Sequence, residues 1–158
     1  MRRLLPIFAV VIGVVSCGGK NGGPGLPECS RPPTAVGCTA TWTGAVTGST
    51  SCTQLSWGNA TGWSFILDGP SANQLSVGAS LAAPPAAGQS FTMDQLSGLI
   101  QLNVGTDWWG ATPNIGGQML LQVDQVVPGS AYIQGSLAGS LVKGSGGSDQ
   151  GVQICITF

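Results

Sequence analysis

The sequence predicts an all-β protein: a single antiparallel β-sandwich of about eight short strands that follows a disordered tether. Three observations predict it. Apolar and polar residues alternate along several segments, which is the period of a half-buried strand. Clusters of glycine, proline and serine separate these segments roughly every ten to fifteen residues. No capped segment has the helical period over the usual length of a helix, and residues 93–99 are expected to form a short turn at most. A closed barrel would show the same pattern and is the alternative.

The first residues have the pattern of an export signal. Two arginines precede the apolar residues 4–15, and a small residue and a cysteine follow them. The apolar run has 12 residues, whereas a transmembrane helix needs roughly 20. We therefore assign residues 1–16 to a signal peptide rather than to a permanent membrane span.

The end of this segment resembles the lipobox of bacterial lipoproteins. Val14, Val15 and Ser16 precede Cys17, with an aliphatic residue three positions before the cysteine and a small residue just before it. The resemblance implies cleavage before Cys17 and attachment of a diacylglyceryl group, with chains of the palmitate type, to its sulfur. It also implies a location in the bacterial cell envelope. In lipoproteins, an aspartate directly after the lipidated cysteine favours retention in the inner membrane. This chain has Gly18 at that position, which resembles the pattern of outer-membrane lipoproteins. The alternative is an ordinary export signal with a cysteine nearby.

A tether and one domain follow the signal. Residues 17–33 contain the lipidated cysteine and a run rich in glycine and proline, which cannot bury apolar surface and is expected to be disordered. Residues 34–158 have the length of one ordinary domain and form the predicted sandwich.

Each predicted strand carries a stripe of alternate apolar residues. The first strand, within residues 39–43, alternates threonines with other residues, and threonine suits the wet face of a sheet. We assign Trp42, Trp57 and Trp63 to the core, where large rings fill the space between sheets. The remaining stripes are Trp63, Phe65 and Leu67; Ile100, Leu102 and Val104; Met119, Leu121 and Val123; Ile133, Leu137 and Leu141; and Val152, Ile154, Ile156 and Phe158.

Several stretches of the domain resemble small exported bacterial β-rich lipoproteins of uncharacterised function. These stretches are TATWTGAVTGS at the start, PPAAGQSFTM in the middle, and YIQGSLAGSLV followed by GVQICITF at the end. The resemblance rests on strand patterns and glycines, so it implies the fold and no activity.

Four cysteines remain once Cys17 is set aside, and an even number in an exported domain predicts two disulfides. Three connectivities are open. Alternation places Cys52 and Cys155 opposite the apolar residues of their strands, so both are expected on outer faces. This predicts a Cys52–Cys155 bond and leaves Cys29 with Cys38. A structural zinc site is disfavoured, because the sequence has no C-x-x-C pair and no histidine, and no other metal or cofactor is expected.

Composition excludes several functions. Charged residues make up 7% of the chain and the formal net charge is −1, so it lacks the basic surface that nucleic-acid binding requires. The absence of histidine excludes Ser-His-Asp and Cys-His catalysis. The acidic residues permit a hydrolase with paired aspartates, because glycosidases need only two carboxylates. Yet they are scattered singly, and Asp68 and Asp149 stand beside turn-forming residues.

Trp108 and Trp109 are adjacent and follow Asp107. Neighbouring residues of a strand point to opposite faces, so one ring is expected to face solvent or to cover a sheet edge. A solvent-facing ring beside Asp107, Asn103 and Asn114 would form a stacking platform for a sugar. Alternatively, this ring covers the open end of the sandwich and binds no ligand.

The sequence therefore predicts a lipid-anchored cell-envelope protein whose β-domain has a structural or interaction role without catalysis. Its expected partners are the membrane, through the lipid, and an envelope protein or a glycan. The second hypothesis is a carbohydrate-binding module that uses the exposed tryptophan. The third is the hydrolase with paired aspartates.

Overall fold

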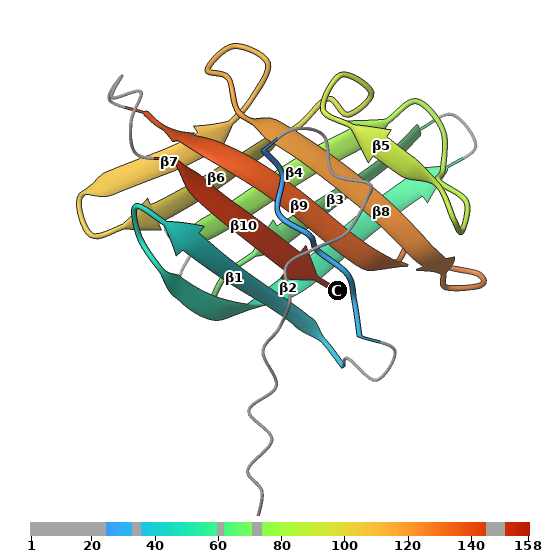
Figure 1. Cartoon of the computed structure of the whole chain (residues 1–158). Coiled ribbons are helices and arrows are strands. Elements are labelled where there is room, and N and C mark those ends of the chain that lie inside the picture. The colour runs from blue at the N-terminus through green and yellow to red at the C-terminus, as the bar shows by residue number, and fades with distance from the viewer. Residues whose placement is uncertain (1–24, 33–35, 60–61, 71–73, 145–150) are drawn as a thin grey trace, which may run out of the picture.

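The computed structural model describes residues 25–32, 36–59, 62–70, 74–144 and 151–158. Within these ranges the chain is all-β, as predicted (Figure 1), and they contain no helix, so none that could cross a membrane. The short turn expected within residues 93–99 forms at residues 93–95 and is held by backbone hydrogen bonds. The strands of the described ranges are β1 (Cys38–Gly44), β2 (Gly48–Asn59), β3 (Gly62–Asp68), β4 (Leu75–Leu81), β5 (Ser90–Thr92), β6 (Leu99–Val104), β7 (Asp107–Ala111), β8 (Gln118–Val126), β9 (Ile133–Lys143) and β10 (Val152–Thr157).

The strands close into a barrel, where the sequence predicted a sandwich. Antiparallel pairing runs through β10, β1, β2, β3, β4, β6, β7 and β9, and β9 pairs again with β10. In the described part of the chain this makes a closed ring of eight strands. β8 pairs with β9, and β5 with β8, beyond the ring. The prediction was wrong because alternation within a strand reports which face is buried, and it does not report which neighbours the strand pairs with.

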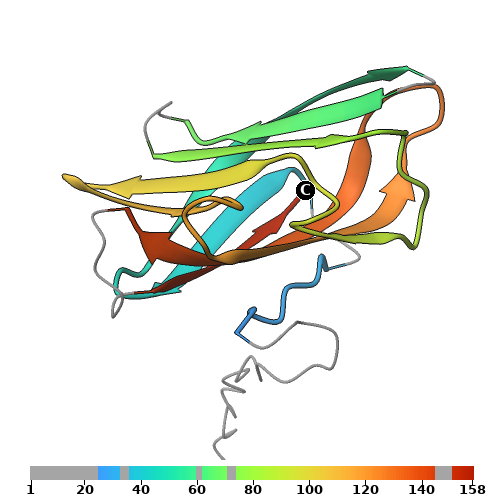
Figure 2. The same ribbon diagram turned by 90° about the horizontal axis from the view of Figure 1, so that it is seen from above.

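The two longest strands make the closure, because each belongs to both layers of the flattened barrel (Figure 2). Residues 48–52 of β2 pair with β1, and residues 53–59 pair with β3. β9 pairs with β10 and β8 over most of its length and reaches β7 at Val142 and Lys143. We call the outer surface of β1, β10, β9 and β8 the strap side. The outer surface of β3, β4, β6, β7 and the second part of β2 is the far side.

A glycine in β9 allows the two layers to pack closely. A Cβ atom built at Gly139 would lie 2.8 Å from Cδ1 of Ile100 in β6 and 2.8 Å from Cγ2 of Ile154 in β10. The side chains of both layers therefore occupy the space that any larger residue would need.

The predicted apolar stripes fill the barrel interior, which confirms most of the predicted core. Val104 is the partial exception, since it is only partly buried. The buried stripe residues are Trp63, Phe65 and Leu67; Ile100 and Leu102; Met119, Leu121 and Val123; Ile133, Leu137 and Leu141; and Val152, Ile154, Ile156 and Phe158.

β2 presents the opposite face from the predicted one. Phe65 of β3 points into the core and pairs with Ser56, and paired residues point to the same side of a sheet. Ser56 therefore faces inward and Trp57 faces out, where its side chain is 53% exposed. The assignment of Trp57 to the core was wrong, whereas that of Trp42 and Trp63 is confirmed.

Residues 25–32, which we call the strap, lie against the strap side across β9 and β10 (Figures 1 and 2). The Gln153 side-chain amide donates to the carbonyl of Gly25 at 3.2 Å. Ser136 and Ala138, the outward residues of β9 in this region, are small and almost fully buried. The predicted tether of residues 17–33 therefore has an ordered part that packs on the barrel. Residues 17–24 and 33 lie outside the described ranges.

Candidate functional site

Two disulfides form, as predicted, but they pair differently. Cys29 bonds Cys155, and Cys38 bonds Cys52. Cys38 and Cys52 are direct cross-strand partners in β1 and β2, with Cα atoms 4.8 Å apart. The predicted Cys52–Cys155 and Cys29–Cys38 pairs are therefore wrong. The parity argument failed because Cys52 lies on the inward side of β2, together with Ser56.

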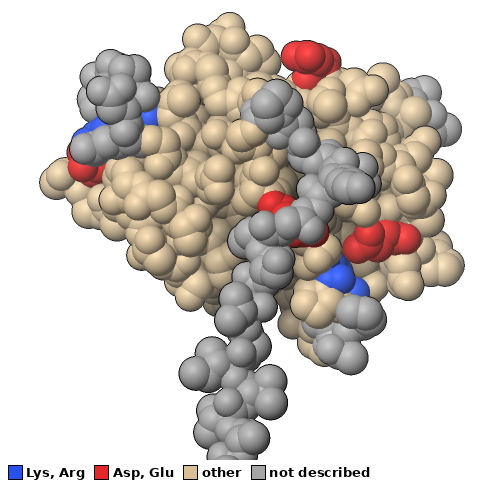
Figure 3. All heavy atoms as spheres, in the orientation of Figure 1, with Lys and Arg blue, Asp and Glu red and all other residues tan. Residues whose placement is uncertain are grey.

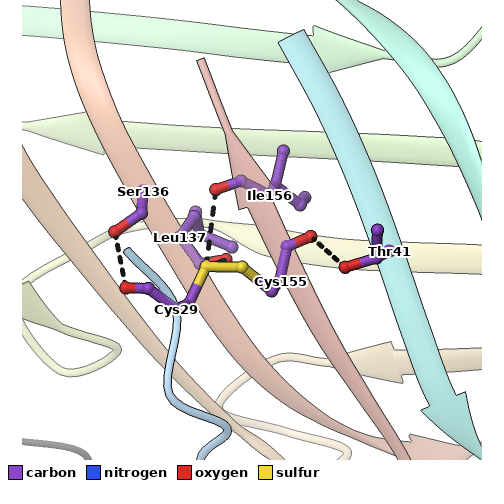
Figure 4. The surroundings of a disulfide bond; sticks show 6 residues. All are labelled: Cys29, Thr41, Ser136, Leu137, Cys155 and Ile156. Atoms are coloured by element: carbon purple, nitrogen blue, oxygen red, sulfur yellow. Dashed lines mark hydrogen bonds between the residues drawn. A yellow bond between two sulfur atoms is a disulfide. The ribbon is translucent and has the colours of Figure 1, made fainter. Parts of the chain in front are cut away.

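The Cys29–Cys155 disulfide fixes the strap to the barrel (Figure 4). Ser136 Oγ donates to the carbonyl of Cys29 at 3.0 Å, so a hydrogen bond supports the covalent link. The Cys29 sulfur lies 3.6 Å from the carbonyl oxygen of Leu137 and 3.7 Å from that of Ile156. Few charged side chains are visible on this face of the molecule (Figure 3). The outward position of Cys155 on β10, which the sequence predicted, is what allows this bond.

The adjacent tryptophans of β7 point to opposite faces, which confirms that part of the prediction. Trp109 is 2% exposed and belongs to the core. Trp108 is 37% exposed and lies on the far side. Trp109 therefore drops out as a binding residue, and Trp108 stays a candidate.

Trp108 lies on a floor made by two glycines. A Cβ atom built at Gly144 would collide with the middle of the indole, so the ring covers the backbone at this position. A Cβ atom at Gly110 would lie 3.1 Å from Cζ3 of the same ring. The indole occupies space that is open because both neighbours lack a side chain, and Ile115 shares the space over Gly110, where a Cβ atom would lie 2.9 Å from its Cδ1. Part of Trp108 remains presented to solvent.

A shallow hollow of about 670 Å³ opens beside Trp108. Gln74, Asn103, Thr106 and Asp107 line it with polar groups. Asn103 is the direct cross-strand partner of Trp108, and its backbone N–H donates to the carbonyl of Gln74 at 2.8 Å. The hollow thus combines an aromatic ring with hydrogen-bonding side chains, as sites for small polar ligands do.

Asp107 lies at the rim of this hollow and forms an ion pair. Its carboxylate is 3.1 Å from Nζ of Lys143, which in turn lies 5.8 Å from the centre of the Trp109 ring. The pair is partly exposed, so its contribution to stability is small. Its effect is to fix the direction of the carboxylate beside Trp108.

Four further residues differ from the sequence-based expectation. Asn114, which was expected beside Trp108, does not line the hollow, and its backbone N–H bonds to Thr112 Oγ1 in a turn. Gln74 and Thr106 line the hollow but were not predicted, because both lie in connections whose course depends on strand order. The exposure of Trp57 was not predicted either. Knowledge of the Cys38–Cys52 pairing would have indicated it, because that pairing places Cys52 on the inward face of β2 and Trp57 on the outward face.

Two of the carboxylates of the described residues are engaged with other side chains. Asp107 pairs with Lys143, and Asp68 accepts a hydrogen bond from Ser76 Oγ at 3.2 Å. Across the described ranges, no group of three or more histidine, cysteine or acidic residues could hold a metal ion. Asp149 lies outside these ranges.

A second hollow, of about 350 Å³, lies near the β8–β9 turn. It is lined mainly by apolar groups, including Pro84, Pro85 and Ile133. Trp63 at its wall is 3% exposed, and its indole N–H is already committed to the carbonyl of Ala131 at 2.8 Å. This hollow therefore presents little that would orient a polar ligand, and the Trp108 hollow is the better candidate.

Comparison with protein-family models, curated proteins and solved structures finds no match to this chain. Cys17, the predicted lipidation site, lies outside the described residues.

Proposed function

We propose that this chain is a lipid-anchored cell-envelope protein whose barrel is a non-catalytic interaction domain. The observation that carries the proposal is the sequence Val14-Val15-Ser16-Cys17 at the end of an apolar export segment. Each CH₂ of an acyl chain buried in a bilayer contributes about 0.8 kcal/mol, so two or more chains hold a domain stably at the membrane. The membrane is therefore the first partner of the protein.

The strap supports this proposal by connecting the anchor firmly to the barrel. Cys29 is twelve positions after Cys17 (29 minus 17) and is bonded covalently to β10. The barrel therefore stays close to the bilayer surface, where it meets other envelope components.

Metabolic labelling with an alkyne fatty acid tests the anchor. We expect label on the wild-type protein and none on Cys17→Ala, with the wild type in the outer-membrane fraction and the variant released from membranes. A matched control is Cys29→Ser/Cys155→Ser, which removes other cysteines and keeps Cys17. Wild-type protein that carries no label and stays in the soluble fraction would refute the anchor.

A specific observation favours a second and narrower function, carbohydrate binding at Trp108. The indole is 37% exposed on a floor of glycines, next to a hollow lined by Asn103 and Thr106. A sugar presents C–H groups on the face of its ring and hydroxyls around its edge. The indole can stack against the C–H groups, and the polar side chains can form hydrogen bonds with the hydroxyls.

Glycan-array binding by purified protein tests this second function. We expect Trp108→Ala to lose binding by roughly tenfold or more, the size of effect seen when a central aromatic contact is removed. Tyr132→Ala is the matched control, because Tyr132 is 41% exposed and lies outside the hollow. Equal binding by wild type and Trp108→Ala would exclude this site.

A further inference from the structure

The far side carries a second exposed tryptophan. Trp57 in β2 is 53% exposed, and its cross-strand partner is Ser64 of β3. Ser64 and Ser80 are also paired, with their hydroxyl oxygens 2.8 Å apart. The cross-strand neighbours of Trp57 in this row are therefore small and polar, whereas its same-strand neighbour on this surface is Leu55.

The two rings lie at opposite corners of the same surface. The row of Trp57, Ser64 and Ser80 continues to Ser97, which exchanges two backbone hydrogen bonds with Ser80. Trp108 pairs with Asn103, six positions after Ser97 (103 minus 97), and β7 is four strands from β2 in the sheet order. With ~3.4 Å per residue and ~4.8 Å between strands, the rings are roughly 25 to 30 Å apart.

Between Trp57 and Trp108, a row of apolar residues on the far side alternates with rows of polar residues. An apolar band crosses the sheet through Leu55, Ile66 and Leu99, and it is interrupted at Gly78, where a Cβ atom would meet nothing within 4 Å. Polar rows flank the band on both sides. One is the serine row beside Trp57, and the other contains Thr53, Asp68, Ser76 and Gln101.

The far side is almost free of charge. Its five strands contain no lysine or arginine, and Asp68 and Asp107 are their only charged residues. Both carboxylates are engaged, Asp68 with Ser76 and Asp107 with Lys143. A strongly charged partner would find no complementary groups on this surface, so a neutral partner is the better match.

The far side also points away from the strap (Figure 2). Eight positions separate Cys17 from Gly25 (25 minus 17), and a chain of that length reaches at most ~29 Å even when fully extended. The two layers of the barrel are ~10 Å apart before their outward side chains are added. A chain this short does not readily pass around the barrel, so an anchor at Cys17 turns the far side away from the bilayer.

We propose that the far side binds an extended, uncharged polysaccharide, with Trp108 and Trp57 stacking on separate sugar units of one chain. The proposal rests on carbohydrate binding at Trp108 and extends that site from one sugar to a polymer. The neutrality of the surface and the spacing of the two rings along the sheet both suit a chain rather than a single sugar.

Affinity electrophoresis in gels that contain hydroxyethylcellulose, laminarin, galactomannan or dextran tests the proposal. We expect at least one polymer to retard the wild type, with Kd raised roughly tenfold by Trp57→Ala and by Trp108→Ala. Calorimetry with the matching disaccharide and trisaccharide should show binding that is weakened by Trp108→Ala and unchanged by Trp57→Ala. Tyr132→Ala is the control, and circular dichroism checks that each variant is folded.

The outcomes separate this proposal from the carbohydrate site on which it rests. If Trp57→Ala binds polymer as the wild type does while Trp108→Ala does not, the extended site is refuted and the Trp108 site stands. If no polymer retards the wild type, the polysaccharide proposal is refuted. A wild-type dimer that Trp57→Ala or Leu55→Ser converts to monomer would instead assign the far side to a second copy of the chain.

Discussion

Two glycines leave space that neighbouring side chains fill. Gly139 leaves room for Ile100 and Ile154 to meet inside the barrel, and Gly144 leaves the floor on which Trp108 lies. At both positions the missing Cβ atom matters because a neighbouring side chain fills the space. The alternation of neighbouring residues then sends Trp109 into the core and Trp108 to the surface.

Replacing Gly139 by alanine should destabilise the barrel. The added Cβ atom would lie 2.8 Å from a side-chain carbon of Ile100 and 2.8 Å from one of Ile154. Overpacking of this kind costs about 1–3 kcal/mol of the free energy of unfolding, measurable by urea denaturation. Gly78→Ala is the matched control, because its Cβ atom meets nothing within 4 Å and should leave stability unchanged or slightly higher. Equal stability of the two variants would contradict the close packing at Gly139.

Among the elements, β2 shows what sequence could and could not predict. The buried stripes of β3, β6, β8, β9 and β10 follow from alternation, although in β9 the outward residues Ser136 and Ala138 are buried as well. In β2 the same reasoning assigned the wrong face to the core, because Leu55 and Trp57 are apolar yet face out. Its orientation is set by its partners in β1 and β3, and pairing of distant segments is not encoded in local period.

The same limit explains why the disulfide partners and some residues of the candidate site could not be predicted. An even count predicted two disulfides, but the partners depend on which strands are neighbours and on the course of the strap. At the site, adjacency predicted that one tryptophan of the pair would be exposed. Gln74 and Thr106 could not be predicted, since only the folded connections bring them beside Trp108.

The two disulfides should contribute differently to stability. On the loop-entropy model, the Cys38–Cys52 bond, with a separation of 14, contributes about 3 kcal/mol, and the Cys29–Cys155 bond, with a separation of 126, about 5 kcal/mol. Paired Cys→Ser variants in urea denaturation measure both values. We expect both variants to keep the barrel, because the core stripes remain. A Cys29→Ser/Cys155→Ser variant as stable as the wild type would contradict the covalent role of the strap.

At the scale of the whole molecule, the barrel has two unlike sides. The strap side carries the covalently fixed end of the N-terminal segment, and the far side carries Trp57, Trp108 and the polar hollow. The proposed anchor on one side and the proposed binding surface on the other would suit a domain held at a membrane and directed toward polymers beyond it. Both features depend on the closed barrel.

The most direct measurement of this account is the mass of the N-terminal peptide of the mature protein, purified from membranes. We predict that residues 1–16 are absent and that Cys17 is the first residue, with a diacylglyceryl group on its sulfur. An unmodified Cys17, or a mature chain that begins at another residue, would contradict the lipid anchor.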